Sequence, residues 1–280
     1  MSFYLISDLH TELLTELQLD ELLSKLKKQK TNVEKDILLL AGDIGNFVTD
    51  DKIKNFEKTM LFFGTKFSKI IWILGNHEHY HSFTTKTYDD ARLLNIRINE
   101  INNKFILLIN ESYEINNFLI LGSTLWSNAQ NSLYATQCIK YIKNFENDVN
   151  LYTLQHLTDL DWLENSINNS KDKNIIVMTH HLPSFQCIDQ QYAKYNIINN
   201  FFATNLEYLF HNNIKCWVYG HTHSANKLTI NDVKLYVNPI GYYKENNKKI
   251  NFEFMKLDLA LEHVVDIKIN NNSSLEHQTI

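Results

Sequence analysis

Cysteine is scarce in this chain: 280 residues contain three cysteines. Cys138, Cys187 and Cys216 are odd in number, widely spaced and form no C-x-x-C pattern. These features argue against a disulfide framework and against a zinc ribbon. A chain that needs no disulfides fits a reducing compartment. The sequence therefore predicts a cytoplasmic protein.

Long apolar runs are missing as well. No segment reaches the roughly eighteen consecutive apolar residues that a membrane-spanning helix needs. A strand-like run begins within three residues of the N-terminus, and no basic segment with an apolar h-region precedes it. We therefore expect no membrane span and no secretory signal.

The chain also lacks an excess of positive charge. Its formal net charge is −5, which argues against general nucleic-acid binding, because such binding depends on neutralising phosphates. A basic cluster at Lys25 to Lys30 is typical of the solvated end of a helix. Nucleic acid is therefore not an expected partner.

Low-complexity linkers, internal repeats and a clear domain seam are absent, and the chain has two prolines. A chain of 280 residues with 44% hydrophobic residues can bury a substantial core. The sequence thus predicts one domain over residues 1–269, followed by a polar tail at residues 270–280.

Hydrophobic periodicity predicts an α/β protein. Helices are expected at residues 12–30, 50–67, 87–102, 132–168 (with a break near Asp148) and 203–211. Three short strand-like pieces at 105–109, 113–115 and 118–121 suggest antiparallel pairing. Alternating segments follow at 227–230, 234–237, 251–257 and 263–269. This order is compatible with two packed sheets and helices outside them.

Five apolar runs end in side chains that can bind a metal. The residues that follow these runs are Asp8 and His10, Asp43, Asn76 and His77, His180, and the pair His221 and His223. In open α/β sheets, ligands bind beyond the carboxyl ends of the strands. Gly220 permits the bend that lets His221 and His223 face one side. Each residue alone fits a turn, a helix cap or a half-buried histidine; the pattern of all of them favours a metal site.

The candidate ligands offer oxygen and imidazole nitrogen but no thiolate. This donor set suits Mn²⁺, Fe, Zn²⁺ or Co²⁺ and disfavours a structural zinc site. Seven ligands exceed what one ion needs, so two ions that share Asp43 are expected. Such a pair, ~3.5–4 Å apart, holds a bridging hydroxide and assists in-line phosphoryl displacement.

At these residues the sequence resembles the calcineurin-like metallophosphoesterases. The blocks of that family stand here in the family's order as Asp8-Leu9-His10, Gly42-Asp43, Gly75-Asn76-His77-Glu78, Val177-Met178-Thr179-His180 and Gly220-His221-Thr222-His223. They span residues 8 to 223. Flanking residues resemble a bacterial-type branch of small phosphohydrolases, whereas the patterns of purple acid phosphatases and of eukaryotic Ser/Thr phosphatases are a poorer match.

The resemblance implies a four-layer α/β/β/α sandwich of two mixed sheets with flanking helices. It also implies a role for each matched residue: Asp8, His10 and His223 at one metal, Asn76, His180 and His221 at the other, Asp43 as the bridge and His77 as the general acid. Proton donation of that kind contributes typically 10²–10⁴-fold to the rate. Glu78 is expected to orient a neighbouring group, such as a histidine.

Other polar and aromatic residues receive simpler interpretations. His79 and His81 are expected in solvent, and His156, His211, His263 and His277 have no candidate partner. His181 fits either a pocket lining or an exposed position. Glu12 and Tyr242 are candidates for the rim of the site, but a position outside it is the simpler interpretation. Trp126 and Trp162 are expected in the core.

The sequence therefore predicts a phosphoesterase with two divalent metals and a small phosphate ester as substrate. Phosphomonoesters and phosphodiesters both remain open, and the weak acidity of the chain leans towards small diesters or nucleotides. Three alternatives are an inactive interaction scaffold of the same fold, a metal-dependent hydrolase of amides or lactones, and a nuclease. The retained ligands and His77 argue against the scaffold, and the lack of a basic groove argues against the nuclease.

Overall fold

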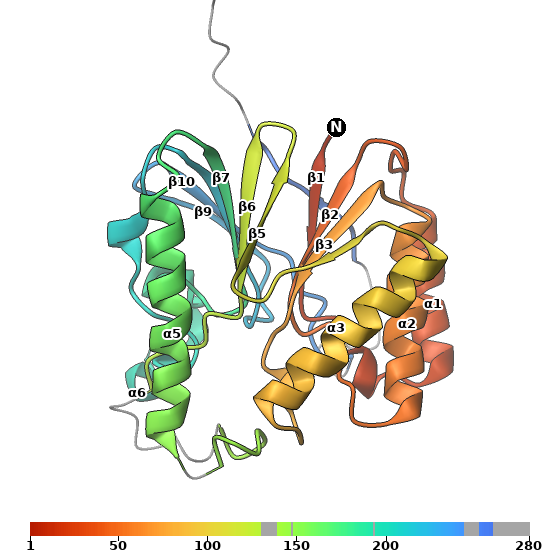
Figure 1. Ribbon diagram of the computed structural model, residues 1–280, viewed down its shortest axis with the longest axis horizontal. Helices are drawn as coiled ribbons and strands as arrows, with labels where there is room; N and C mark the ends of the chain where they lie inside the picture. The colour runs from red at the N-terminus through yellow and green to blue at the C-terminus, as the bar shows by residue number, and fades with distance from the viewer. Residues whose placement is uncertain (130–138, 147, 193, 244–251, 260–280) are drawn as a thin grey trace, which may run out of the picture.

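Two β-sheets pack face to face, and helices cover their outer surfaces (Figure 1). The computed structural model describes residues 1–129, 139–146, 148–192, 194–243 and 252–259. Helices α1–α3 lie on one side of the pair of sheets and α5 lies on the other, so the layers run helix, sheet, sheet, helix. The predicted four-layer α/β/β/α architecture is confirmed.

The first sheet contains most of the N-terminal strands in the order β11-β1-β2-β3-β4. These strands are β1 (Phe3–Ile6), β2 (Ile37–Ala41), β3 (Lys69–Ile73), β4 (Phe105–Leu107) and β11 (Met255–Lys256). Strands β1 to β4 are parallel, and β11 is antiparallel to β1. Parallel strands point their carboxyl ends to the same edge, so the segments after β1, β2 and β3 meet there.

The second sheet has the order β5-β6-β7-β8-β10-β9. Its strands are β5 (Glu111–Ile115), β6 (Phe118–Ser123), β7 (Asn174–Thr179), β8 (Ile214–Tyr219), β10 (Val233–Val237) and β9 (Asn226–Ile230). Strands β6, β7, β8 and β10 are parallel to one another, and β5 and β9 add antiparallel edges. The carboxyl ends of β7 and β8 therefore also share one edge.

The strands are apolar on both sides because both faces are buried. Along β2, Leu39 packs into the core between the two sheets, whereas Leu38 and Leu40 pack towards the helices. Side chains of successive strand residues point to opposite faces. The core between the sheets also includes Ile71 from β3 and Ile176 from β7, so it joins the two sheets directly.

Apolar faces of the helices cover the outer surfaces of the sheets. The helices are α1 (Glu16–Lys27), α2 (Asp50–Gly64), α3 (Thr84–Ile101), α5 (Val149–Asn168) and the short α6 (Asn196–Asn199). Phe56 and Phe63 of α2 pack on the first sheet, and Leu163 of α5 packs on the second. In the described part of the chain, no helix is long and apolar enough to cross a membrane.

The first predicted helix begins later than its apolar periodicity indicates. Thr15 caps α1: its hydroxyl accepts a hydrogen bond from the Gln18 backbone N–H, and the Gln18 side chain accepts one from the Thr15 N–H. Residues Thr11–Leu13 form a separate 3₁₀ turn before it. This early break leaves Glu12 outside the helix, next to His10.

Two other expectations differ from the structure, and two more concern residues that it does not describe. Strand β4 pairs with β3 in parallel, so only the later two of the three middle segments form an antiparallel pair. The helix expected at 203–211 is a single 3₁₀ turn at Glu207–Leu209. The strand expected at 263–269 and the tail at 270–280 lie outside the described residues. A local apolar pattern does not determine the neighbouring strand or the length of a turn.

The burial of Leu39 between the sheets gives a prediction about stability. Leu39 is fully buried, whereas Leu17 on α1 is 82% exposed. Leu39→Ala should lower the free energy of unfolding by about 2–5 kcal/mol, because it leaves a cavity in a packed core. Leu17→Ala should change it by less than about 0.5 kcal/mol. Denaturant unfolding of both variants measures the difference, and equal effects would contradict this packing.

Candidate metal centre

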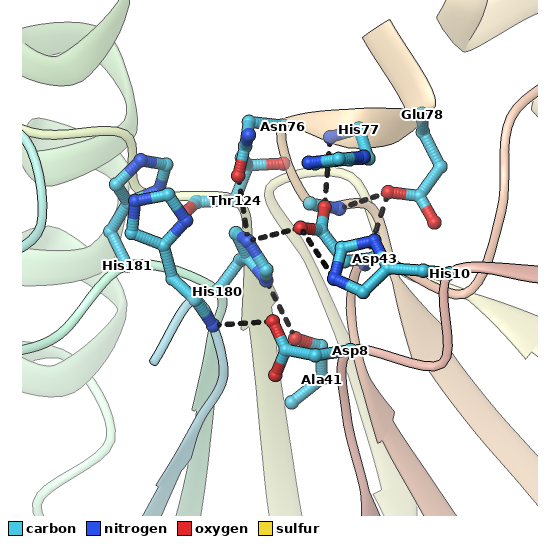
Figure 2. Close-up of polar contacts among 12 residues, drawn as sticks. Asp8, His10, Ala41, Asp43, Asn76, His77, Glu78, Thr124, His180 and His181 are labelled. Atoms are coloured by element: carbon cyan, nitrogen blue, oxygen red, sulfur yellow. Dashed lines mark hydrogen bonds and ion pairs between the residues drawn. The ribbon is translucent and has the colours of Figure 1, made fainter. Parts of the chain in front are cut away.

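Eight sequence-predicted residues meet at one edge where the two sheets adjoin. Figure 2 shows Asp8, His10, Asp43, Asn76, His77 and His180 among them. The first sheet supplies Asp8 and His10 after β1, Asp43 after β2, and Asn76 and His77 after β3; the second supplies His180 after β7 and His221 and His223 after β8. The structure thus brings all seven predicted ligands and His77 together. Metal binding itself stays a prediction.

Asp43 lies at the centre of the cluster. Its Oδ2 atom is 3.4 Å from His180 Nε2 and 3.9 Å from His10 Nε2. Its Oδ1 atom accepts a 2.8 Å hydrogen bond from the His77 backbone N–H. One carboxylate oxygen therefore lies between a histidine of the first sheet and a histidine of the second, which is the position a bridging ligand needs.

The remaining ligand atoms form two groups around Asp43. Asp8, His10 and His223 offer three atoms that all lie within 4.8 Å of one another, and Asp43, His180 and His221 offer another such set. Asn76 Oδ1 is 2.9 Å from His180 Nε2 and belongs to the second group by position. These groups agree with the two ligand sets that the resemblance implies.

Two observations show that these residues fit divalent cations. The Oδ2 atom of Asp8 is fully buried and has no hydrogen-bond partner among the described residues. A buried carboxylate oxygen without a donor is costly, and a cation would satisfy it. The donors are carboxylate, amide and imidazole groups, which suit Mn²⁺, Zn²⁺, Fe and Co²⁺.

The electrostatics of the cluster also favour cations. Burial alone would lower the pKa of His180, but the nearby Asp43 and Asp8 carboxylates raise it to about 9. The His180, His77 and His10 imidazoles hold the pKa of Asp43 well below its ordinary value, against the effect of burial. In contrast, burial and the neighbouring His181 and His180 imidazoles lower the pKa of His221.

Backbone conformation around the ligands is unusual. Asp8, His10, Asp43 and His221 all have positive φ angles, between 50° and 65°. Such conformations cost about 1–3 kcal/mol each in a non-glycine residue and concentrate at functional sites. The bend predicted at Gly220 is located at His221 instead.

Gly220 and Gly75 are required by close contacts. A Cβ atom on Gly220 would lie 2.5 Å from the Ala41 carbonyl oxygen, and one on Gly75 would lie 2.2 Å from Asp43 Oδ1. Neither distance is possible for a real side chain. These glycines let the strand ends approach one another closely enough to bring the ligands together.

Glu78 organises the loops that carry the ligands. Its buried Oε2 accepts hydrogen bonds from the backbone N–H groups of Asp43 (3.1 Å) and Gly75 (2.7 Å). Its Oε1 accepts them from Ile44 (2.7 Å) and Gly45 (3.3 Å). The expected orienting role therefore acts on the backbone of the β2 and β3 loops rather than on a histidine.

Glu12 and Tyr242, which were expected outside the site, both contact His77. Glu12 Oε1 is 2.9 Å from His77 Nδ1, and the Tyr242 hydroxyl is 3.2 Å from His77 Nε2. Burial would raise the pKa of Glu12, but hydrogen bonds from His10 and His77 lower it to about 2. The sequence signal for Glu12 was its position two residues after His10.

Tyr242 reaches the site because the chain after β10 continues along β1. The Ile240 N–H donates to the Ser7 carbonyl (3.1 Å) and the Gly241 N–H donates to the Asp8 carbonyl (2.9 Å). Gly241 has a φ of +71°, a conformation that favours glycine. The turn then places the Tyr242 ring against His10 and His223, with centroids 4.7 and 4.4 Å away.

Two histidine predictions are resolved. His79, expected in solvent, is buried between the rings of Tyr88 and Trp126, and burial lowers its pKa to about 3. His181 is buried too, and its ring lies 4.3 Å from that of His221. Trp126 is in the core, as expected, and His81 is exposed. The polar sequence around His79 does not reveal that Tyr88 and Trp126 cover this residue.

Comparison with known proteins supports the same fold. A family model described as calcineurin-like phosphoesterase matches residues 1–225. Uncharacterized protein L509 of Acanthamoeba polyphaga mimivirus is 30% identical over 284 residues, which cover 91% of this chain and 96% of that protein. The phosphopantetheinyl hydrolase PptH of Mycobacterium tuberculosis shares the fold, with a TM-score of 0.68 and 15% identity over 91% of this chain and 95% of that chain.

The four hydrogen bonds of Glu78 predict the effect of its replacement. In Glu78→Gln, the amide NH₂ would face backbone N–H donors, so at least one buried donor would lose its acceptor. The free energy of unfolding should fall by about 1–3 kcal/mol. Affinity for Zn²⁺ should fall about 10–100-fold, because the Asp43 loop loses its support.

Denaturant unfolding and isothermal titration with Zn²⁺ measure these two effects. Glu34→Gln, at an exposed position, is the matched control and should change neither. Wild-type stability and Zn²⁺ affinity in Glu78→Gln would show that the loops do not depend on this carboxylate.

Proposed function

This chain belongs to the calcineurin-like phosphoesterase family, and from that premise we propose that it hydrolyses small phosphate esters with two divalent cations. The observation that carries the proposal is the place of Asp43 Oδ2, between His10 Nε2 at 3.9 Å and His180 Nε2 at 3.4 Å. A carboxylate in that position would be able to contact two ions.

The ligand assignment follows the two groups of side chains. Asp8, His10 and His223 would hold one ion, Asn76, His180 and His221 the other, and Asp43 would contact both. Two divalent cations supply Lewis acidity for phosphoryl oxygens and a water that ionises near neutral pH. The chain's own contribution is to fix the ligands rigidly, through buried strand ends and the Glu78 hydrogen bonds.

His77 is the proposed general acid. Its backbone N–H donates to Asp43 Oδ1, which holds the His77 backbone beside the centre of the cluster. Glu12 contacts Nδ1, and Nε2 points to the Tyr242 hydroxyl on the opposite side. We propose that Nε2 donates a proton to the leaving oxygen of the ester as the bond to phosphorus breaks.

The substrate class is a small phosphate ester rather than a nucleic acid. The formal net charge of −5 provides no general attraction for a polyanion. Assays with p-nitrophenyl phosphate and bis-p-nitrophenyl phosphate, each with Mn²⁺, Zn²⁺ or Co²⁺, distinguish monoesterase from diesterase activity. Failure to hydrolyse either ester with any of these ions would favour the inactive-scaffold alternative.

Replacement of the shared carboxylate tests the two-ion arrangement. Asp43→Asn should lower kcat/KM for the preferred p-nitrophenyl ester by about 10³-fold or more, since it removes several kcal/mol of transition-state stabilisation. It should also lower the amount of bound metal measured by atomic emission. Asp20→Asn, at the exposed Asp20, is the control and should retain both. Full activity of Asp43→Asn with a native circular-dichroism spectrum would contradict the mechanism.

Replacement of His77 tests the proton transfer. His77→Ala should lower kcat by about 10²–10⁴-fold for an alkyl phosphate ester, whose leaving oxygen needs a proton. The loss should be much smaller for the p-nitrophenyl ester, because p-nitrophenolate leaves without protonation. Steady-state kinetics on both esters measure the ratio, with His211→Ala as the control. Equal losses on the two esters would assign His77 to a role other than general acid.

A further inference from the structure

A single buried carboxylate connects the metal-binding half of the site to His77. The Glu12 side chain is 2% exposed. Its Oε1 atom lies 2.9 Å from His77 Nδ1 and 3.4 Å from His10 Nδ1. His10 and His77 lie in different loops, and each directs its Nδ1 atom at the same oxygen of Glu12.

This geometry determines where the ring protons lie. A carboxylate accepts hydrogen bonds and donates none, and a neutral imidazole carries one N–H. Both Nδ1 atoms must therefore carry a hydrogen. In a neutral ring Nε2 then has the lone pair, and in an imidazolium Nε2 carries a second hydrogen, which is the form from which His77 would donate. A histidine can bind a cation only through the nitrogen without hydrogen.

The Nε2 atoms point where the proposed chemistry requires them. His10 Nε2 lies 3.9 Å from Asp43 Oδ2 and 3.1 Å from His223 Nε2, inside the ligand cluster. His77 Nε2 lies on the side away from Glu12, 3.2 Å from the Tyr242 hydroxyl. The opposite tautomer would direct an N–H of His10 at the cation position.

We propose that Glu12 is a positioning residue shared by both halves of the site: it fixes His10 for cation binding and His77 for proton donation by holding both Nδ1–H groups. The proton-donating half of this proposal rests on the proposed phosphoesterase function. The tautomers of the two rings do not depend on that function.

The local structure supports a dedicated place for Glu12. The left-handed backbone at His10 (φ 50°) and the 3₁₀ turn Thr11–Leu13 turn the chain back on itself, and the capping of α1 at Thr15 keeps Glu12 out of the helix. The second oxygen, Oε2, is buried without a hydrogen-bond partner within the part of the chain that the structure describes. A carboxylate at such a position is costly, and the contacts with His10 and His77 offset part of that cost.

A third cation is the competing explanation. His10, Glu12 and His77 offer ligand atoms that lie within 4.8 Å of one another. The 2.9 Å contact between Glu12 Oε1 and His77 Nδ1 favours a hydrogen bond, because it is a normal donor–acceptor distance. The two explanations predict different ring protonation and different metal stoichiometry.

Nitrogen NMR of the histidine rings tests the proposal directly. In long-range ¹H–¹⁵N spectra of the ¹⁵N-labelled full chain, His10 and His77 are assigned by comparison with variants at each position. Without metal, at a pH where the rings are neutral, both should be Nδ1–H tautomers in the wild type; with Zn²⁺ bound, neutral His77 should remain so. A predominant Nε2–H tautomer at His77 in the wild type would overturn the proposal without any variant.

The variant Glu12→Ala sharpens the test. It removes both carboxylate oxygens, so neither Nδ1–H group keeps its acceptor. At least one of the two rings should change tautomer. Affinity for Zn²⁺ or kcat should fall about 10–100-fold, and the loss in kcat should be larger for an alkyl ester than for a p-nitrophenyl ester. Glu16→Ala, at the 82% exposed Glu16, is the matched control and should show none of these changes.

The outcomes separate this inference from the proposed function. Wild-type tautomers, affinity and leaving-group dependence in Glu12→Ala would overturn the inference even if the wild type is an active phosphoesterase. An inactive wild type with both Nδ1–H tautomers would overturn the proposed function and leave the tautomer control by Glu12 standing. Three bound Zn²⁺ per chain, falling to two in Glu12→Ala, would establish the third-cation explanation instead.

Discussion

The burial of two carboxylates against several imidazoles, at the edge where two sheets adjoin, is the constraint on which this structure depends. Asp8 and Asp43 lie almost entirely out of water, and an ionised group there is costly unless opposite charge or hydrogen-bond donors surround it. Asp43 has the His77 N–H, His180 and His10 around it. The Asp43 and Asp8 carboxylates that raise the pKa of His180 to about 9 would also attract divalent cations.

The rest of the fold keeps these groups in place despite local strain. Four of the proposed ligands have left-handed backbone conformations, and strained residues persist only where the surroundings determine them fully. Here the surroundings are parallel strands that end at the same edge, glycines at the closest approaches, and Glu78 with its four backbone N–H donors. Rigid support of this kind is what preorganises a metal site.

The sequence predicted the site residues that directly follow strands. It missed the positions of residues that depend on contacts with distant parts of the chain. Asp43, Asn76 and His180 follow apolar runs directly, so parallel pairing alone brings them to one edge. Tyr242 arrives because the chain after β10 pairs with β1, more than 230 residues earlier. His79 is buried by Tyr88 and Trp126, to which no local pattern connects it. Apolar periodicity describes one segment at a time and contains no information about such neighbours.

The division of the site between the sheets links chemistry to folding. The first sheet supplies Asp8, His10, Asp43, Asn76 and His77, and the second supplies His180, His221, His223 and, after β10, Tyr242. Neither sheet alone holds a full set of ligands, so the site exists only when the apolar core between the sheets has formed. Asp43 and His180 make the contact from opposite sheets. Any change that shifts one sheet against the other would therefore change the distances around Asp43 before it unfolds the chain.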